Sequence, residues 1–320
     1  MARARDEADA RPIPYVLGSG EADEVALYGS IKPLLREVLP AAAVAQARAR
    51  FEPLGLSVRE AEHRVPQASA SGTVLFVARD ERLVAEAVRC EAAPDHDHEL
   101  GRLLGYPRCC VEAYLEVPPP RRNVDVFAHA LAASEACLPR LNVVDLAVFH
   151  YVSWLPCSFA CALSKRYADA VASHIATKHG QFLVRGRKPD TTCPSGCRHE
   201  RFVAAIDEAH RAHRLLITEQ VQISLRGVFR HGLVHVERMW PTARDRHPEA
   251  ALAVEAREAV ARLVVRLEGV ATVSVIDGVL YADERPVLRA PDAMLFPFEA
   301  PENSPGLKSG APTARRSPPG

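Results

Sequence analysis

Apolar and polar residues follow two different periods along the chain, and these periods predict where strands and helices lie. Residues 56–65 alternate between apolar and polar side chains, which predicts a strand with one buried face. Residues 73–80 form a short apolar run and predict a buried strand. Helices are expected at residues 21–36, bent or broken near Pro33, at 41–51 and at 81–90. The N-terminal part therefore predicts a small α/β layer.

The middle of the chain, roughly residues 96–215, is rich in helical patterns. Helices are expected at residues 123–138, from Pro156 to about His179, and at 199–216. Residues 143–154 are apolar and fit either a strand or a helix. This part of the sequence predicts a helical layer.

The pattern changes again after Glu219. Residues 221–229 and 232–240 predict two strands, and 248–269 predict a helix that ends at Gly269. An Asp-Gly pair between β-branched runs predicts a hairpin within residues 271–283. The predicted fold class is α+β, with an N-terminal α/β layer, a helical, cysteine-bearing middle and a C-terminal ββαββ lobe.

Composition divides the chain into four parts. Residues 1–12 and 301–320 lack a core-forming pattern, and we expect both to be disordered. Between them we expect an α/β plus helical metal-binding domain at 13–215 and an α+β lobe at 216–300.

Charge and hydropathy narrow the classes of function. Lys and Arg number 40, as do Asp and Glu, so the net charge gives no reason to expect nucleic acid. No stretch reaches the roughly 18 apolar residues of a membrane span, and the first residues do not look like a signal peptide. We therefore expect a cytoplasmic protein with a small-molecule or protein partner and no membrane partner. In that reducing compartment, eight cysteines favour metal binding or thiol chemistry over disulfides.

Six of the cysteines occur in three pairs that share one local design. The pairs are Cys109 with Cys110, Cys157 with Cys161, and Cys193 with Cys197, and each lies at or just before a predicted helix start. Unpaired amides and the helix dipole stabilise anions there, so we expect a lowered thiol pKa and more thiolate. Cys157 and Cys161, four residues apart, would share one helix face. Adjacent Cys109 and Cys110 diverge by about 100° on a helix, so both bind one ion only at the helix tip.

Thiolates gathered in a cytoplasmic protein favour an iron–sulfur cluster or zinc. The leading hypothesis is a metal-cluster protein of the iron–sulfur type, with a redox or accessory role in a biosynthetic pathway. The first alternative is a structural zinc protein that acts as a binding module, and the second is a metal-free thiol enzyme. The sequence names no substrate or reaction and leaves open whether the protein is an enzyme.

Other residues are less well supported as ligands of the metal site. His150 is a candidate ligand or proton donor, although its apolar neighbours make a buried core histidine equally reasonable. Cys193 and Cys197 could instead form a second site with His199. Cys90 and Cys137 each lie alone in a helical pattern, and we expect both to be packing residues.

The segments ELGRLLGYPRCCVEAYLE and HYVSWLPCSFACALSKRYA resemble an uncharacterised prokaryotic family of unknown function. That family carries a GYP-x-CC element followed downstream by an H…PCS-x2-C element. The matching positions are Gly105, Tyr106, Pro107, Cys109, Cys110, His150, Pro156, Cys157, Ser158 and Cys161. The resemblance spans roughly residues 99–175. It implies that these cysteines belong together, and it implies no reaction.

Overall fold

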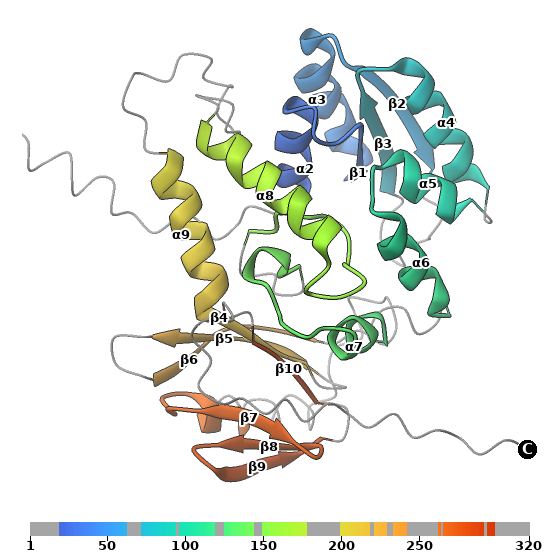
Figure 1. Cartoon of the computed structure of the whole chain (residues 1–320). Coiled ribbons are helices and arrows are strands. Elements are labelled where there is room, and N and C mark those ends of the chain that lie inside the picture. Colours follow the sequence, from blue (N-terminus) through green and yellow to red (C-terminus); the bar gives the residue numbers. More distant parts are fainter. Residues whose placement is uncertain are drawn as a thin grey trace, which may run out of the picture.

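The structure is a computed structural model, in which an N-terminal α/β layer and two C-terminal sheets lie on opposite sides of a helical middle (Figure 1). It describes residues 19–62, 72–93, 96–118, 125–143, 149–177, 199–217, 221–228, 233–241, 262–263, 265–290 and 293–297. The chain is an α+β protein, as the sequence predicted. The two segments expected to be disordered lie outside the described residues, and the domain boundaries stay predictions.

The N-terminal layer is a three-stranded antiparallel sheet between two helices. Its elements are α2 (Ser19–Tyr28), β1 (Leu34–Pro40), α3 (Ala41–Phe51), η1 (Glu52–Leu54), β2 (Ser57–Glu62), β3 (Gly72–Ala78) and α4 (Glu81–Ala92). The strand order is β1-β3-β2, so β3 is central and its side chains from Val74 onward are buried. Alternate residues of β3 point to opposite faces. Phe76 packs toward α4, whereas Leu75 and Val77 pack toward α3.

The predicted helix at 21–36 is wrong beyond Tyr28. The backbone of Ser30 is left-handed, with φ of +56°, and Ile31 N–H donates to the Ala26 carbonyl at 2.8 Å, which ends the helix. Leu34 and Leu35 then enter β1 and pack on opposite faces of the sheet. A pair of adjacent leucines fits the helical pattern equally well, so only pairing with β3 decides between the two structures.

The helical middle contains α5 (Asp97–Leu103), α6 (Arg108–Glu116), α7 (Asp125–Ala132), η3 (Pro139–Leu141), α8 (Ala162–Thr177) and α9 (His199–Ala212). The predicted helix at 123–138 is shorter than expected, and the one at 199–216 ends where β4 begins at His213. The described residues of the ambiguous 143–154 segment form neither helix nor strand. Ala168 and Ala172 of α8 are buried against α2 and α9, and their small side chains allow close packing.

The C-terminal part contains two antiparallel sheets. The larger has the order β10-β4-β5-β6 and is built from Met294–Pro297, His213–Ile217, Val221–Val228 and Leu233–Pro241. The smaller has the order β7-β8-β9 and is built from Val273–Ile276, Val279–Ala282 and Arg285–Arg289. Positive φ at both Asp277 and Gly278 makes their turn a tight hairpin of the predicted kind.

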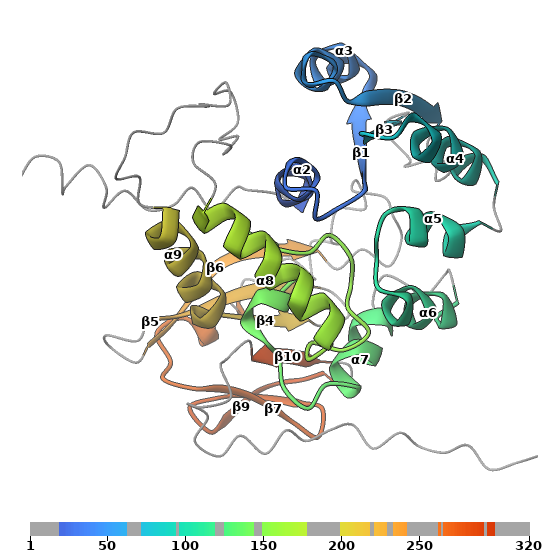
Figure 2. The same ribbon diagram turned by 45° about the horizontal axis from the view of Figure 1, so that its top comes forward.

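The ββαββ prediction found four strands and missed β4, β9 and β10. Of the predicted helix at 248–269, residues 262–263 and 265–267 are helical, and 248–261 lie outside the described residues. Figure 2 shows that α6, α7, α8 and α9 separate the N-terminal layer from these sheets. Among the helices that the structure describes, none has the length and apolar character needed to cross a bilayer.

Candidate metal centre

The first pair of cysteines lies in the first turn of α6. Pro107 precedes the helix with extended ψ of 134°, and its carbonyl accepts the Cys110 amide proton at 2.9 Å. Gly105 makes the turn from α5 with φ of +77°, a conformation that L side chains rarely adopt. A Cβ at this position would also lie 2.7 Å from Cδ of Pro33. The Gly-Tyr-Pro sequence therefore fixes where α6 begins and where its cysteines point.

The second pair does not share a helix face, and here the prediction of a helix from Pro156 is wrong. Helix α8 begins at Ala162, and Cys161 stands immediately before it, with its carbonyl accepting the Lys165 amide proton at 2.9 Å. The preceding loop is bonded to the segment that follows α7. Phe159 N–H donates to the Ser134 hydroxyl, and the Phe159 carbonyl accepts from Leu138 N–H. These long-range bonds replace the helical ones, so Cys157 reaches the site from a loop.

The two pairs meet in space. The sulfurs of Cys109, Cys110, Cys157 and Cys161 all lie within 4.8 Å of one another. Three of the separations are 4.0 Å (109 to 110), 3.9 Å (109 to 161) and 3.8 Å (110 to 161). Four sulfurs bound tetrahedrally to zinc at about 2.3 Å lie about 3.8 Å apart. The three separations among Cys109, Cys110 and Cys161 are close to this edge length, and Cys157 lies near enough to be a fourth ligand.

The environment of the sulfurs supplies hydrogen bonds that would stabilise negative charge. Cys157 N–H donates to the Cys110 sulfur at 3.3 Å, and the Ser164 hydroxyl lies 3.3 Å from the same sulfur. Trp154 Nε1–H donates to the Ser164 oxygen at 3.1 Å, which leaves the hydroxyl proton available to Cys110. The amino-terminal ends of α6 and α8 both lie at the cluster, so two helix dipoles add positive potential.

Burial opposes ionisation of two of the thiols. It raises the pKa of Cys110 to about 12, and it also raises the pKa of Cys157, with help from the neighbouring thiols. For Cys161, burial raises the pKa, but hydrogen bonds outweigh it, the largest from the Ser164 amide, and the pKa falls to about 7. The expectation of a lowered pKa at every cysteine is therefore wrong for Cys110 and Cys157. Four adjacent thiolates need a cation among them, and a bound metal would provide it.

The remaining candidates are not grouped with these sulfurs or lie outside the described residues. His150 is buried and is not among the residues that the described part of the chain brings to the sulfurs. Burial lowers the pKa of His210, and the neighbouring His150 adds to this effect. Cys193 and Cys197 are outside the described residues, and so is the side chain of His199, the first residue of α9.

The two isolated cysteines are buried and are not part of the cluster. Cys90 packs between α4 and the N-terminal sheet. Cys137 lies in the main core, in the loop after α7 rather than in the expected helix, and burial raises its pKa to about 12.

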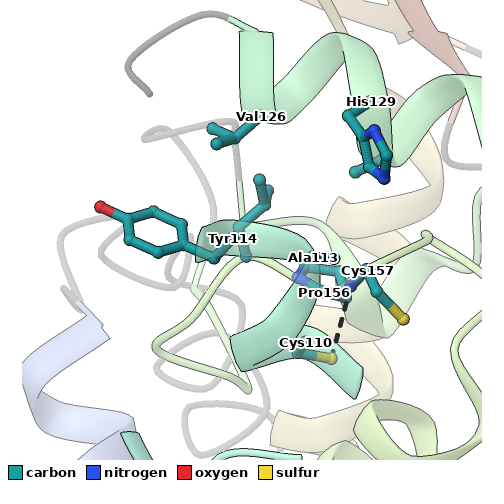
Figure 3. A pocket seen from close by; sticks show the side chains of 9 residues that line it. Cys110, Ala113, Tyr114, Val126, His129, Pro156 and Cys157 are labelled. Atoms are coloured by element: carbon teal, nitrogen blue, oxygen red, sulfur yellow. Dashed lines mark hydrogen bonds between the residues drawn. The ribbon is translucent and has the colours of Figure 1, made fainter. Parts of the chain in front are cut away.

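A small, shallow pocket borders the cluster (Figure 3). Its lining comes from α6, α7 and the loop before Cys161, and comprises Cys110, Ala113, Tyr114, Val126, His129, Ala130, Leu155, Pro156 and Cys157. In Figure 3, His129 of α7 lies across the pocket from Cys110. Sequence reasoning missed Tyr114 and His129, because nothing in their local pattern sets them apart from other residues on exposed helix faces.

Comparison with known proteins finds a match to one family, whose function is unknown. Residues 81–178 match DUF483, a family described as a protein of unknown function. The matched segment extends from α4 to the end of α8 and contains all four clustered cysteines. It is consistent with the resemblance to an uncharacterised family noted above. Neither the curated proteins nor the solved structures gave a match.

Proposed function

We propose that Cys109, Cys110, Cys157 and Cys161 bind one metal ion, zinc, as four thiolate ligands. The observation that carries this proposal is the spacing of the sulfurs. Three separations of 3.8 to 4.0 Å are close to the edge of a zinc tetrahedron, and all four sulfurs lie within 4.8 Å of one another. The ion would tie the loop that contains Cys157 to the first turn of α6, two segments that no strand pairing or helix joins. In a reducing compartment a disulfide would not provide this cross-link.

One ion fits this spacing better than an iron–sulfur cluster. A cluster distributes its cysteine ligands over several irons, so some ligand sulfurs lie farther apart than in a single tetrahedron. The iron–sulfur cluster, which the sequence favoured, is thus less well supported by this spacing than a single ion. A single iron in the same four-thiolate site would suit the donors equally well. Such an iron would retain the redox or accessory role in a biosynthetic pathway.

The number of ligands supports a structural role over a catalytic one. Catalytic zinc sites usually leave one position open for water or substrate, whereas four protein ligands close the coordination sphere. Cys110 and Cys161 are buried, and the core around them includes Trp154 and Phe159. An ion here would hold the surrounding loop in one conformation and so shape the neighbouring pocket.

The proposal extends to the compartment and the partner. Thiols only 3.8 to 4.0 Å apart would oxidise to disulfides in an oxidising compartment, so we propose the cytoplasm. The balanced net charge of the chain supports a small-molecule or protein partner rather than nucleic acid.

Metal analysis of anaerobically purified protein tests the proposal. We expect one zinc per chain and a colourless protein. Replacing zinc with Co²⁺ should give the strong sulfur-to-metal absorption and visible bands of a tetrahedral four-thiolate site. Protein that contains neither zinc nor iron and does not take up Co²⁺ would refute it.

Other results would favour the alternatives. A brown protein that contains both iron and acid-labile sulfide would indicate a cluster, and iron without sulfide would indicate a single iron. Metal-free protein in which one cysteine is alkylated much faster than the others would favour a thiol enzyme.

A further inference from the structure

A buried ion pair lies next to the segments that carry the cysteines. Lys32 is 1% exposed and Asp23 is 4% exposed, and Lys32 Nζ lies 2.5 Å from Asp23 Oδ2. Removing two charges from water is costly, and an apolar pair of the same size is often at least as stable. A buried ion pair is therefore not in itself evidence of added stability.

The Lys32 ammonium contacts both segments that lead to the cysteines. It donates to the Ser153 hydroxyl at 2.9 Å, and it lies 4.9 Å from the centre of the Tyr106 ring. Tyr106 is three residues before Cys109, and Ser153 is four residues before Cys157. One ammonium group thus contacts the segment that precedes each cysteine pair.

Two further contacts connect this region with the sulfurs. The Tyr106 ring lies 4.9 Å from the Trp154 ring, and Trp154 donates to Ser164, which lies beside the Cys110 sulfur. Pro33, next to Lys32, occupies the space beside Gly105, where a Cβ would lie 2.7 Å from its ring. The connection between α2 and β1 therefore packs on both approach segments.

We propose that Lys32 and Asp23 are positioning residues for the metal centre, and this rests on the proposed function. Asp23 orients the ammonium, and the ammonium fixes the segments of Tyr106 and Ser153, so that the four sulfurs converge before the ion binds. Outer contacts of this kind raise metal affinity because less order must be imposed on binding. Both residues lie outside the segment that matches the family, so the N-terminal layer contributes to a site whose ligands all lie within that segment.

The test asks whether variants of the full-length chain lose metal affinity for a reason other than lost stability. The main variant is D23L/K32M, which removes both charges together and leaves none unpaired. Ser153→Ala removes one hydrogen bond of the ammonium and is the milder variant. The matched control is R36M/E91L, which removes the bidentate ion pair between β1 and α4, in neither of the two segments that carry the clustered cysteines. For each, zinc affinity is measured by competition with a chromophoric chelator, and the Co²⁺ spectrum is recorded.

We expect D23L/K32M to bind zinc about 10-fold more weakly, with shifted or weaker visible Co²⁺ bands. Ser153→Ala should lower affinity by a smaller factor, and R36M/E91L should bind as the wild type does even where it unfolds more easily. Wild-type affinity and spectrum in D23L/K32M would overturn the positioning role. Should that variant not fold, unchanged affinity in Ser153→Ala would overturn it. Wild-type protein that binds no metal would instead refute the proposed function.

Discussion

The sulfur of Cys110 lies 3.8 Å from the sulfur of Cys161, although 51 positions separate the two residues along the chain. The contact joins the first turn of α6 to the residue immediately before α8. Cys109 and Cys157 complete the group from the same two segments. Four thiols brought together in this way give the chain a ligand set for a soft metal ion.

Replacing one ligand should remove the ion. We expect Cys161→Ser to lose stoichiometric zinc and, where zinc exceeds its dissociation constant about 1,000-fold, about 4 kcal/mol of free energy of unfolding. The matched control is Cys137→Ala, which removes a buried thiol from the same core outside the ligand set. It should unfold more easily yet retain its zinc. Equal zinc contents in the two variants would contradict the assignment of the ligands.

Removing the metal should destabilise only a protein that has the complete set of ligands. A strong zinc chelator is expected to lower the midpoint of thermal unfolding of the wild type, because the ion stabilises only the folded state. The same chelator should leave the midpoint of Cys161→Ser unchanged. Scanning calorimetry with and without chelator measures both. An equal shift in the two proteins would mean that the chelator acts elsewhere.

Gly105 should tolerate a side chain less well than another glycine of similar backbone. Its φ is +77°, and Gly55 has φ of +71°. A Cβ at Gly105 would meet Pro33, whereas nothing lies within 4 Å of a Cβ at Gly55. We expect Gly55→Ala to cost about 1 kcal/mol from backbone strain alone, and Gly105→Ala to cost more.

Urea titration of the two variants separates these contributions. Equal losses would show that contact with Pro33 is unimportant. We also expect Gly105→Ala, and not Gly55→Ala, to weaken zinc binding, because the turn directs Tyr106 and the start of α6.

His210 should make the fold sensitive to acid. The side chain is fully buried, with Nδ1 2.6 Å from the Pro139 carbonyl and Nε2 beside that of Phe149. The two carbonyls favour the charged ring, but burial is the larger influence and lowers the pKa to about 4. An unfolded histidine titrates near about 6.5. Stability from this residue is therefore complete above that pH and is lost as the pH falls toward 4.

The measurement is the free energy of unfolding between pH 7.5 and 4.5. The loss due to one such proton is at most about 1.4 kcal/mol per pH unit. His210→Gln should be less stable at pH 7.5 and should show a shallower decline on the acid side. His129→Gln replaces an exposed histidine and should keep the wild-type slope. A wild-type slope in His210→Gln would contradict this account.

Local sequence patterns predicted some helices and turns well. They failed where contacts between residues distant in sequence determine the secondary structure. Helix α3 has the expected bounds, and Asp277-Gly278 forms the expected hairpin, because the spacing of apolar residues and the chemistry of a turn act within a few residues. The segment at Leu34 became a strand because β3 pairs with it. The residues after Pro156 form a loop because Ser134 and Leu138 hold the backbone of Phe159.

By itself, the sequence determined the mixed fold class, the hairpin and the identity of the thiols that could act together. Residue type sets donor chemistry, and short spacing sets local conformation, so both can be read along the chain. The tertiary structure alone decided that the sulfurs of Cys109 and Cys110 lie beside those of Cys157 and Cys161, and that His150 is not grouped with them. Those relationships depend on side chains distant in sequence, whose separation is fixed only when the core packs.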